Sequence, residues 1–211
     1  MILEKYRREI RSEALRRQIT HLYHFTPLQN VRSILTHGLV SARDLKDDVA
    51  DGFRTDNNRR DGFPQCICLS IGTIYHDMLR SKQKLNRRNE WVVFVVDASV
   101  LWEHDCRFCW LNAASSEIKD TRAFIGGPWA FRRMFADYKT FGSSPLTVRE
   151  KDNLPDNFPT DRGAEVQVFG RIGVEKFVGI GVATAYRQSR LEADLKAAQL
   201  DIPVSLTDWV A

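Results

Sequence analysis

Tyr23-His24-Phe25-Thr26 is an apolar strand end that carries one histidine and one threonine, and Pro27 follows it directly. Proline fixes φ and has no backbone N–H, so it ends the strand and opens a turn. Apolar residues then recur at the i, i+3, i+4 spacing of a one-faced helix, at Val31, Ile34 and Leu35. Gly38 is expected to close this helix as its C′ residue. The stretch therefore predicts a strand that turns sharply into a short helix.

Two polar side chains of this corner share one side of the strand. His24 and Thr26 are two residues apart, and side chains alternate along a strand, so both face the same way. They lie beside a helix start, where backbone N–H groups can receive a phosphate or a carboxamide. The corner is a candidate nucleotide-binding site. For a histidine considered alone, the alternative of a buried, hydrogen-bonded core residue is favoured.

A second segment far downstream carries a single carboxylate. Residues 159–168 read Pro-Thr-Asp-Arg-Gly-Ala-Glu-Val-Gln-Val, a turn that enters a strand with Glu165 near its beginning. By itself this pattern favours a surface glutamate on an edge strand. Between the two segments lie further motifs: Arg59-Arg60-Asp61-Gly62, Cys66-Ile67-Cys68-Leu69-Ser70-Ile71, Asp105-Cys106-Arg107-Phe108-Cys109, Asn112-Ala113-Ala114, and Gly127-Pro128-Trp129-Ala130-Phe131 with Met134-Phe135.

Taken in this order, the motifs resemble the DarT family, the toxin component of DarT–DarG toxin–antitoxin systems. Such toxins are ADP-ribosyltransferases that use NAD to modify a nucleobase, typically in single-stranded DNA. The resemblance extends from about residue 20 to about residue 185. It implies NAD as co-substrate, release of nicotinamide, and a cognate antitoxin that reverses the modification or blocks the site.

The resemblance also implies roles for particular residues. Glu165 matches the catalytic glutamate, and the essential arginine falls at Arg59 or Arg60, both of which are candidates. The residues implied for NAD binding are Tyr23, His24, Thr26, Asn30 and Leu39. The loop before the catalytic glutamate of ADP-ribosyltransferases generally helps to recognise the acceptor. The resemblance therefore implies that Arg149, Lys151 and Arg162 contact the nucleic acid.

The chemistry of these side chains suits such a reaction. Cleavage of the nicotinamide–ribose bond passes through an oxocarbenium-like transition state, which a nearby carboxylate stabilises. An arginine is a poor general base because its pKa exceeds about 12, so its expected role is to hold the pyrophosphate through a fork of N–H donors. The motif around residues 66–71 varies between subgroups of the family, so the modified base stays open.

Composition agrees with a compact enzyme. A chain of 211 residues with 43% hydrophobic residues is long enough for one good core, and one domain over residues 1–211 is expected. A net charge of +4 suits an anionic partner without requiring one. No apolar run approaches the ~20 residues that span a bilayer, and residues 1–18 lack the apolar core of a signal peptide. We therefore expect a cytoplasmic protein with no membrane partner.

Four cysteines raise the alternative of a zinc site. Cys66-x-Cys68 and Cys106-x-x-Cys109 offer four thiols, and the second spacing is common in metal pairs. Cys66 and Cys68, however, fall in a predicted buried strand, where small soft side chains pack well. No metal is expected.

Periodicity predicts a chain of short, irregularly joined elements. Helices are predicted over about 3–18, 28–36, 74–84, 128–137 and 188–199, and strands over about 21–26, 66–71, 91–96, 164–169 and 176–183. Long polar loops are predicted over about 42–64 and 138–163. This order favours an α+β fold, and the resemblance refines it to a single-domain ADP-ribosyltransferase-like fold with a central split β core flanked by helices.

The nucleic-acid surface has two candidate basic patches. One comprises Lys82, Lys84, Arg87 and Arg88, and the other comprises Arg122, Arg132, Arg133 and Lys139. Interleaved aromatic side chains can stack on unpaired bases, although at least half of them fit the core face of a helix equally well.

Two alternatives to DNA modification remain at this stage. The same chemistry on RNA is one, because the sequence does not tell DNA from RNA, and a non-enzymatic nucleic-acid-binding module is the other. A dinucleotide-binding fold for hydride transfer is disfavoured, because no G-x-G-x-x-G follows an early strand. DNA is favoured over RNA as the partner.

Overall fold

A computed structural model describes residues 2–46, 59–121, 124–139 and 145–210. Its helices are α1 (Ile2–Arg16), α2 (Val31–His37), α3 (His76–Leu85), α4 (Val100–Glu103), α5 (Ser116–Asp120), α6 (Pro128–Arg133), α7 (Val148–Lys151) and α8 (Ala185–Ala197). Its strands are β1 (His21–Pro27), β2 (Cys66–Ile71), β3 (Trp91–Asp97), β4 (Cys106–Cys109), β5 (Glu165–Phe169), β6 (Phe177–Val182) and β7 (Val204–Leu206).

The strands of the described residues form one mixed sheet in the order β4-β5-β2-β1-β3-β6-β7. Only β6 and β7 are parallel neighbours. All seven residues of β1 pair with β3, whereas β1 pairs with β2 only through Leu22 and Tyr23. The sheet therefore divides between β1 and β2 from His24 onward. This confirms the predicted α+β fold with a split β core.

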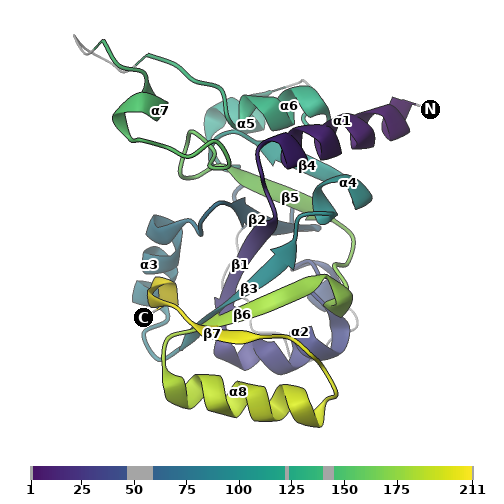
Figure 1. Ribbon diagram of the computed structural model, residues 1–211, viewed down its shortest axis with the longest axis vertical. Helices are drawn as coiled ribbons and strands as arrows, with labels where there is room; N and C mark the ends of the chain where they lie inside the picture. The colour runs from purple at the N-terminus through teal and green to yellow at the C-terminus, as the bar shows by residue number, and fades with distance from the viewer. Residues whose placement is uncertain (1, 47–58, 122–123, 140–144, 211) are drawn as a thin grey trace.

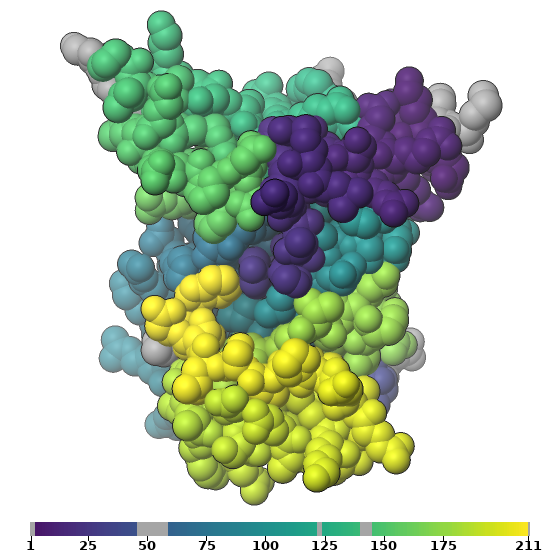
Figure 2. Space-filling model, viewed as in Figure 1, coloured from purple at the N-terminus to yellow at the C-terminus, as the bar shows by residue number. Residues whose placement is uncertain are grey.

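Alternation along the strands sets up two apolar layers. Leu22, Phe94 and Val96 belong to the main core, while Trp91 and Val93 belong to a smaller cluster with Leu79 of α3. Figure 1 shows α3 apart on one side of the sheet, α2 and α8 at its lower end, and α1, α5 and α6 at its upper end. In Figure 2 the purple N-terminal helix and the yellow C-terminal segment cover the upper and lower parts of one face.

Most predicted elements lie within a few residues of the observed ones. The strand predicted over 66–71 is β2, and that over 91–96 is β3. Five short elements were not predicted: α4, β4 and α5 lie in a segment without clear periodicity, α7 in the predicted second loop, and β7 near the C-terminus. Each spans only three to five residues, too few for a period to show. Most of the predicted first loop, 47–58, lies outside the described residues.

Gly38 ends α2 as predicted, and its surroundings predict a large effect of substitution. Its φ is +75°, and a Cβ built there would lie 2.3 Å from the carbonyl oxygen of Ile172. Gly38→Ala should therefore lower the free energy of unfolding by about 2 kcal/mol or more, through both backbone strain and a steric clash. Chemical denaturation of the two proteins measures this difference.

The matched control is Gly170→Ala. Gly170 has a similar φ of +80°, but a Cβ added there would meet no atom within 4 Å, so only the backbone effect, about 1 kcal/mol, applies. If the two variants lose equal amounts of unfolding free energy, the close contact with Ile172 does not contribute to the effect of Gly38→Ala.

The four cysteines are free thiols, and their positions do not support a shared zinc ion. Cys66 and Cys68 lie in β2 and Cys106 and Cys109 in β4, on opposite sides of β5. Strands two places apart are separated by about 10 Å, too far for one metal at bonding distance. Burial also raises the pKa of Cys66 to about 11 and that of Cys109 to about 12, so both stay protonated. Among the described helices, none combines the length and apolarity needed to cross a bilayer.

Candidate active site

One carboxylate is buried where β5 begins, beside Cys68 of β2. Glu165 begins β5, and its Oε1 accepts a hydrogen bond from the backbone N–H of Ala113 at 2.8 Å. Burial raises the pKa of Glu165, and the hydrogen bonds from the Cys68 thiol and from Ala113 oppose that shift. The Coulomb attraction of Arg59 also lowers the pKa of this carboxyl. The carboxylate is thus fixed in place in a poorly solvated setting.

Arg59 lies close to Glu165 and is tightly paired with Asp61. Its Nε and Nη2 donate to the two carboxylate oxygens of Asp61 at 3.1 and 2.6 Å. Nη1 donates to the carbonyl of Cys66 at 3.0 Å, and Nη2 contacts the sulfur of Cys68 at 3.3 Å. Burial lowers the pKa of Arg59, but the hydrogen bond and charge of Asp61 outweigh it and raise the pKa above its ordinary value.

This pairing changes the interpretation of the arginine. A guanidinium has five N–H donors, and four of them are already used by Asp61, Cys66 and Cys68. The fork that was expected to hold the pyrophosphate faces Asp61 instead. One N–H and a fixed positive charge remain available to a substrate.

A polar row across three strands supports the Arg59–Asp61 pair. Gln167 is fully buried in β5, opposite Cys68 of β2 and Arg107 of β4. Its Nε2 donates to Asp61, and its Oε1 accepts from Arg107. The pKa of Asp61 is lowered because the hydrogen bonds and charge of Arg59 outweigh the effect of burial. Asp61 therefore stays ionised and holds Arg59 in one orientation.

His24 faces the site from the other side of the split. Its Nδ1 lies 3.0 Å from the carbonyl oxygen of Cys68, which can only accept, so Nδ1 carries the proton. Burial lowers the pKa of His24, and the charge of Arg59 adds to this effect. The imidazole is therefore neutral at pH 7, and its Nε2 is a hydrogen-bond acceptor.

The other predicted NAD-binding residues occupy different positions. Thr26 and Asn30 are buried, and the Asn30 amide donates to the Thr26 hydroxyl at 2.9 Å, which fixes the turn after β1. Tyr23 packs edge-on against Trp209 with ring centroids 5.0 Å apart. Leu39 is a core residue whose backbone pairs with Ile172, so the structure gives its side chain a packing role.

Arg60 does not join the cluster around Glu165. Its side chain is exposed and forms no hydrogen bond or ion pair with any residue in the described ranges, whereas Arg59 is half-buried. Of the two arginines left open by the sequence, geometry brings only Arg59 to the candidate site.

The three predicted nucleic-acid contacts also differ from one another. Arg149 stabilises its own loop, because its guanidinium donates hydrogen bonds to the carbonyls of Phe158 and Pro155 and to the Thr160 hydroxyl. Those donors are not free for a phosphate, which argues against the predicted role. Lys151 and Arg162 are exposed, and Arg162 forms only a loose ion pair with Asp152 at 3.8 Å.

Asp61, Cys68 and Gln167 belong to the site but were not predicted as functional. The signal was present in the spacing: Gln167 follows Glu165 by two residues, so both face one side of β5. Asp61 follows Arg59 by two residues in a loop, where no periodicity indicates contact.

The residues present suit NAD. A carboxylate, a neutral histidine acceptor and a fixed guanidinium charge surround Cys68. They suit a ribose that lies between a cationic nicotinamide ring and an anionic pyrophosphate. No group of three or more candidate metal ligands occurs among the described residues.

Comparison with solved structures gives the same fold. DarT of Thermus sp. 2.9 in complex with ADP-ribosylated ssDNA matches with a TM-score of 0.62 and 14% identity, over 92% of this chain and 97% of that chain. The same protein in complex with NAD+ matches with a TM-score of 0.61 and 15% identity, over 92% and 98%. Thermosipho africanus DarTG in complex with ADP-ribose matches with a TM-score of 0.53 and 19% identity over 88% of this chain, which spans 49% of that longer chain. No curated protein matches the sequence.

A family comparison goes beyond the fold. The family described as "ssDNA thymidine ADP-ribosyltransferase, DarT" matches residues 23–209, nearly the whole chain. This confirms the resemblance seen in the motifs and the enzyme class that it implied, with NAD as co-substrate and single-stranded DNA as partner. The chain belongs to the DarT family of ADP-ribosyltransferases.

Proposed function

We propose that this enzyme transfers ADP-ribose from NAD to a thymine base of single-stranded DNA, with Glu165, Arg59 and His24 as the residues that act on NAD and on the base. One observation carries the proposal: the three side chains converge on Cys68 of β2, where His24 contacts the carbonyl oxygen and Arg59 and Glu165 contact the sulfur. Thymidine is the nucleoside named for the family, and the identity of the modified base is what the sequence left open.

His24 binds and orients the ribose next to nicotinamide. Because Nδ1 donates to Cys68, the free lone pair of Nε2 accepts a hydrogen bond from a ribose hydroxyl. A neutral imidazole also avoids placing a second positive charge beside the nicotinamide ring, which is cationic in NAD.

Glu165 stabilises the cleavage step. As the bond between ribose C1′ and the nicotinamide nitrogen breaks, its electron pair leaves with nicotinamide and positive charge grows on the ribose. The carboxylate held by Ala113 lies in a poorly solvated setting, where it stabilises that charge more strongly than it would in water.

Arg59 and Glu165 act together when the base attacks C1′. The attacking ring nitrogen of thymine carries a proton, and its loss leaves electron density that the fixed Arg59 charge stabilises. Asp61 keeps Arg59 protonated, so the arginine is not the base. Glu165 accepts the proton, a role that its raised pKa favours.

The biological setting follows from the family. We propose that the chain is the toxin of a toxin–antitoxin pair, that a cognate antitoxin reverses the modification or blocks the site, and that the enzyme acts in the cytoplasm, where NAD and unpaired DNA are present. The support is the family match and the likeness to the DarTG fold.

The direct test incubates the purified protein with NAD labelled in the adenylate part and with matched single-stranded DNA, duplex DNA and RNA of one sequence. We expect label on the single strand when it contains thymine, because a duplex buries the base edge. Label on RNA in preference to DNA would replace the proposed substrate by the RNA alternative. No label on any nucleic acid would overturn the assignment.

A further inference from the structure

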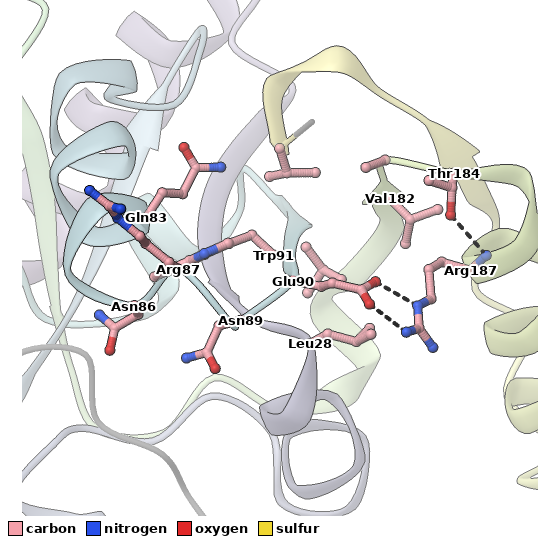
Figure 3. A pocket seen from close by; sticks show the side chains of 13 residues that line it. Leu28, Gln83, Asn86, Arg87, Asn89, Glu90, Trp91, Val182, Thr184 and Arg187 are labelled. Carbon is pink, nitrogen blue, oxygen red and sulfur yellow. Dashed lines mark hydrogen bonds and ion pairs between the residues drawn. The ribbon is translucent and has the colours of Figure 1, made fainter.

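A cavity of about 380 Å³ lies away from Glu165, between the end of α3, the start of β3 and the first turn of α8. Figure 3 shows the side chains that line it, with Gln83, Asn86 and Arg87 on one side and the Glu90–Arg187 pair on the other. Its size falls in the range of pockets that hold small ligands or single ligand groups. Leu28 and Val182 give it an apolar wall.

Trp91 lines this cavity and carries a buried indole N–H beside it. The residue is only 4% exposed, and its indole nitrogen has no hydrogen-bond partner among the described residues. In Figure 3 the ring nitrogen of Trp91 points to the side of the cavity that Gln83 and Arg87 form. A buried donor without a partner is unfavourable, and an acceptor in the cavity that reaches this N–H through a shift of the side chains around it would remove that cost.

Arg87 lines the cavity on the α3 side, and two further cations, Lys84 and Arg88, lie close to it in the sequence. Lys84, Arg87 and Arg88 are exposed, and none of them forms an ion pair within the part of the chain that the structure describes. Arg187, on the opposite rim, is different because Glu90 holds its guanidinium through two hydrogen bonds of 2.6 and 2.5 Å. The free positive charge is thus concentrated beside the end of α3.

The cavity lies at the C-terminal end of α3, and Tyr75 lies directly before the first residue of this helix. Burial raises the pKa of the Tyr75 hydroxyl, and the charges of Asp77, Asp161 and Glu165 add to this effect in decreasing order, so Glu165 lies on the Tyr75 side of the helix. The helix has ten residues, so its two ends are about 15 Å apart. A few nucleotides of an extended strand can bridge that length.

We propose that this cavity is a second contact site for single-stranded DNA, with one unpaired base in the cavity and the adjoining phosphates on Lys84, Arg87 and Arg88. A base offers a flat apolar body for Leu28 and Val182, a carbonyl acceptor for Trp91, and an edge for the amides of Gln83 and Asn86. This inference rests on the proposed function, because it assigns part of the DNA substrate to a surface outside the reaction centre.

The test measures binding and modification with two thymine-containing single strands, one limited to the nucleotides at Glu165 and one long enough to pass along α3. Arg87→Ala/Arg88→Ala should weaken binding of the long strand about tenfold and reduce its log–log salt slope by about 1.4, for two lost phosphate contacts. Trp91→Phe keeps the ring but removes the N–H, and should weaken binding about fivefold. Modification of the short strand should be unchanged.

Arg190→Ala is the matched control, because Arg190 is an exposed cation of α8 that does not line the cavity. The inference would be overturned if Arg87→Ala/Arg88→Ala bound the long strand with the affinity and the salt slope of the wild type. This outcome does not depend on whether Trp91→Phe folds. Equally tight binding of free thymidine monophosphate and of the long strand would assign the cavity to a free nucleotide instead. Failure of the proposed function would look different, because no strand would be modified by any variant while DNA binding could still be compared.

Discussion

Glu165→Gln is expected to reduce transfer of ADP-ribose by a factor of about 10²–10³ or more, while NAD binding persists. The amide keeps the shape of the side chain and can still accept from the Ala113 N–H, but it neither offsets positive charge on the ribose nor accepts the base proton. Single-turnover transfer to a single-stranded oligonucleotide measures the loss. A variant that retains near-normal transfer would remove Glu165 from the mechanism.

Stability provides an internal control for this variant. Burial raises the pKa of Glu165 in the folded state, so the folded protein holds this proton more tightly than the unfolded chain does. The carboxyl therefore costs stability as pH rises from the unfolded pKa, about 4.5, through the raised folded pKa. Gln does not ionise, so Glu165→Gln should melt no lower than the wild type at pH 7, with the difference shrinking toward pH 4. A lower melting temperature at pH 7 would mean that lost packing, rather than lost chemistry, explains the inactivity.

Removal of Arg59 should have the second largest effect, about 10² in the transfer rate, with little change for Arg60→Ala. Arg59 is the arginine that lies beside Glu165, Cys68 and Asp61, while Arg60 is exposed. Transfer rates at saturating NAD and DNA, measured for both variants, test this. Equal, negligible effects from the two substitutions would show that neither arginine takes part in the reaction.

The choice of variant matters because Arg59 neutralises the buried Asp61. Arg59→Ala alone leaves that carboxylate unpaired, a change that typically costs about 3–5 kcal/mol of stability. Arg59→Gln/Asp61→Asn removes both charges together and avoids this penalty. Arg59→Lys keeps the positive charge without the fork that holds Asp61, so it should retain more activity than the uncharged pair. If Arg59→Lys is no more active than the double variant, the positive charge alone does not account for the contribution of Arg59.

Much of the fold could be predicted from local patterns. Strands β2 and β3 follow from continuous apolar runs bounded by polar turns, and the end of α2 follows from Gly38. Short elements such as β4 could not be predicted, because four residues contain no period and their partners lie far along the chain, as in the pairing of Arg107 with Gln167, which are 60 residues apart.

The candidate site divides in the same way. The motif order was sufficient to indicate the DarT family, and hence an enzyme that uses NAD, because each motif keeps its place along the chain. Glu165 and His24 could be named from their motifs. The sequence did not separate Arg59 from Arg60, since both are arginines in one loop and nothing local distinguishes their surroundings.

The sequence by itself thus determined which residue types are proposed for the reaction and which elements carry them. Only the tertiary structure decided which partners those residues have. Pairing of β2 with β5 places Gln167 against Asp61, and Asp61 then occupies the guanidinium fork that had been expected to hold a pyrophosphate. The divergence of β1 from β2 leaves His24 bonded to a backbone carbonyl and neutral. Hydrogen-bond partners and burial depend on which distant segments meet, and no local pattern records that.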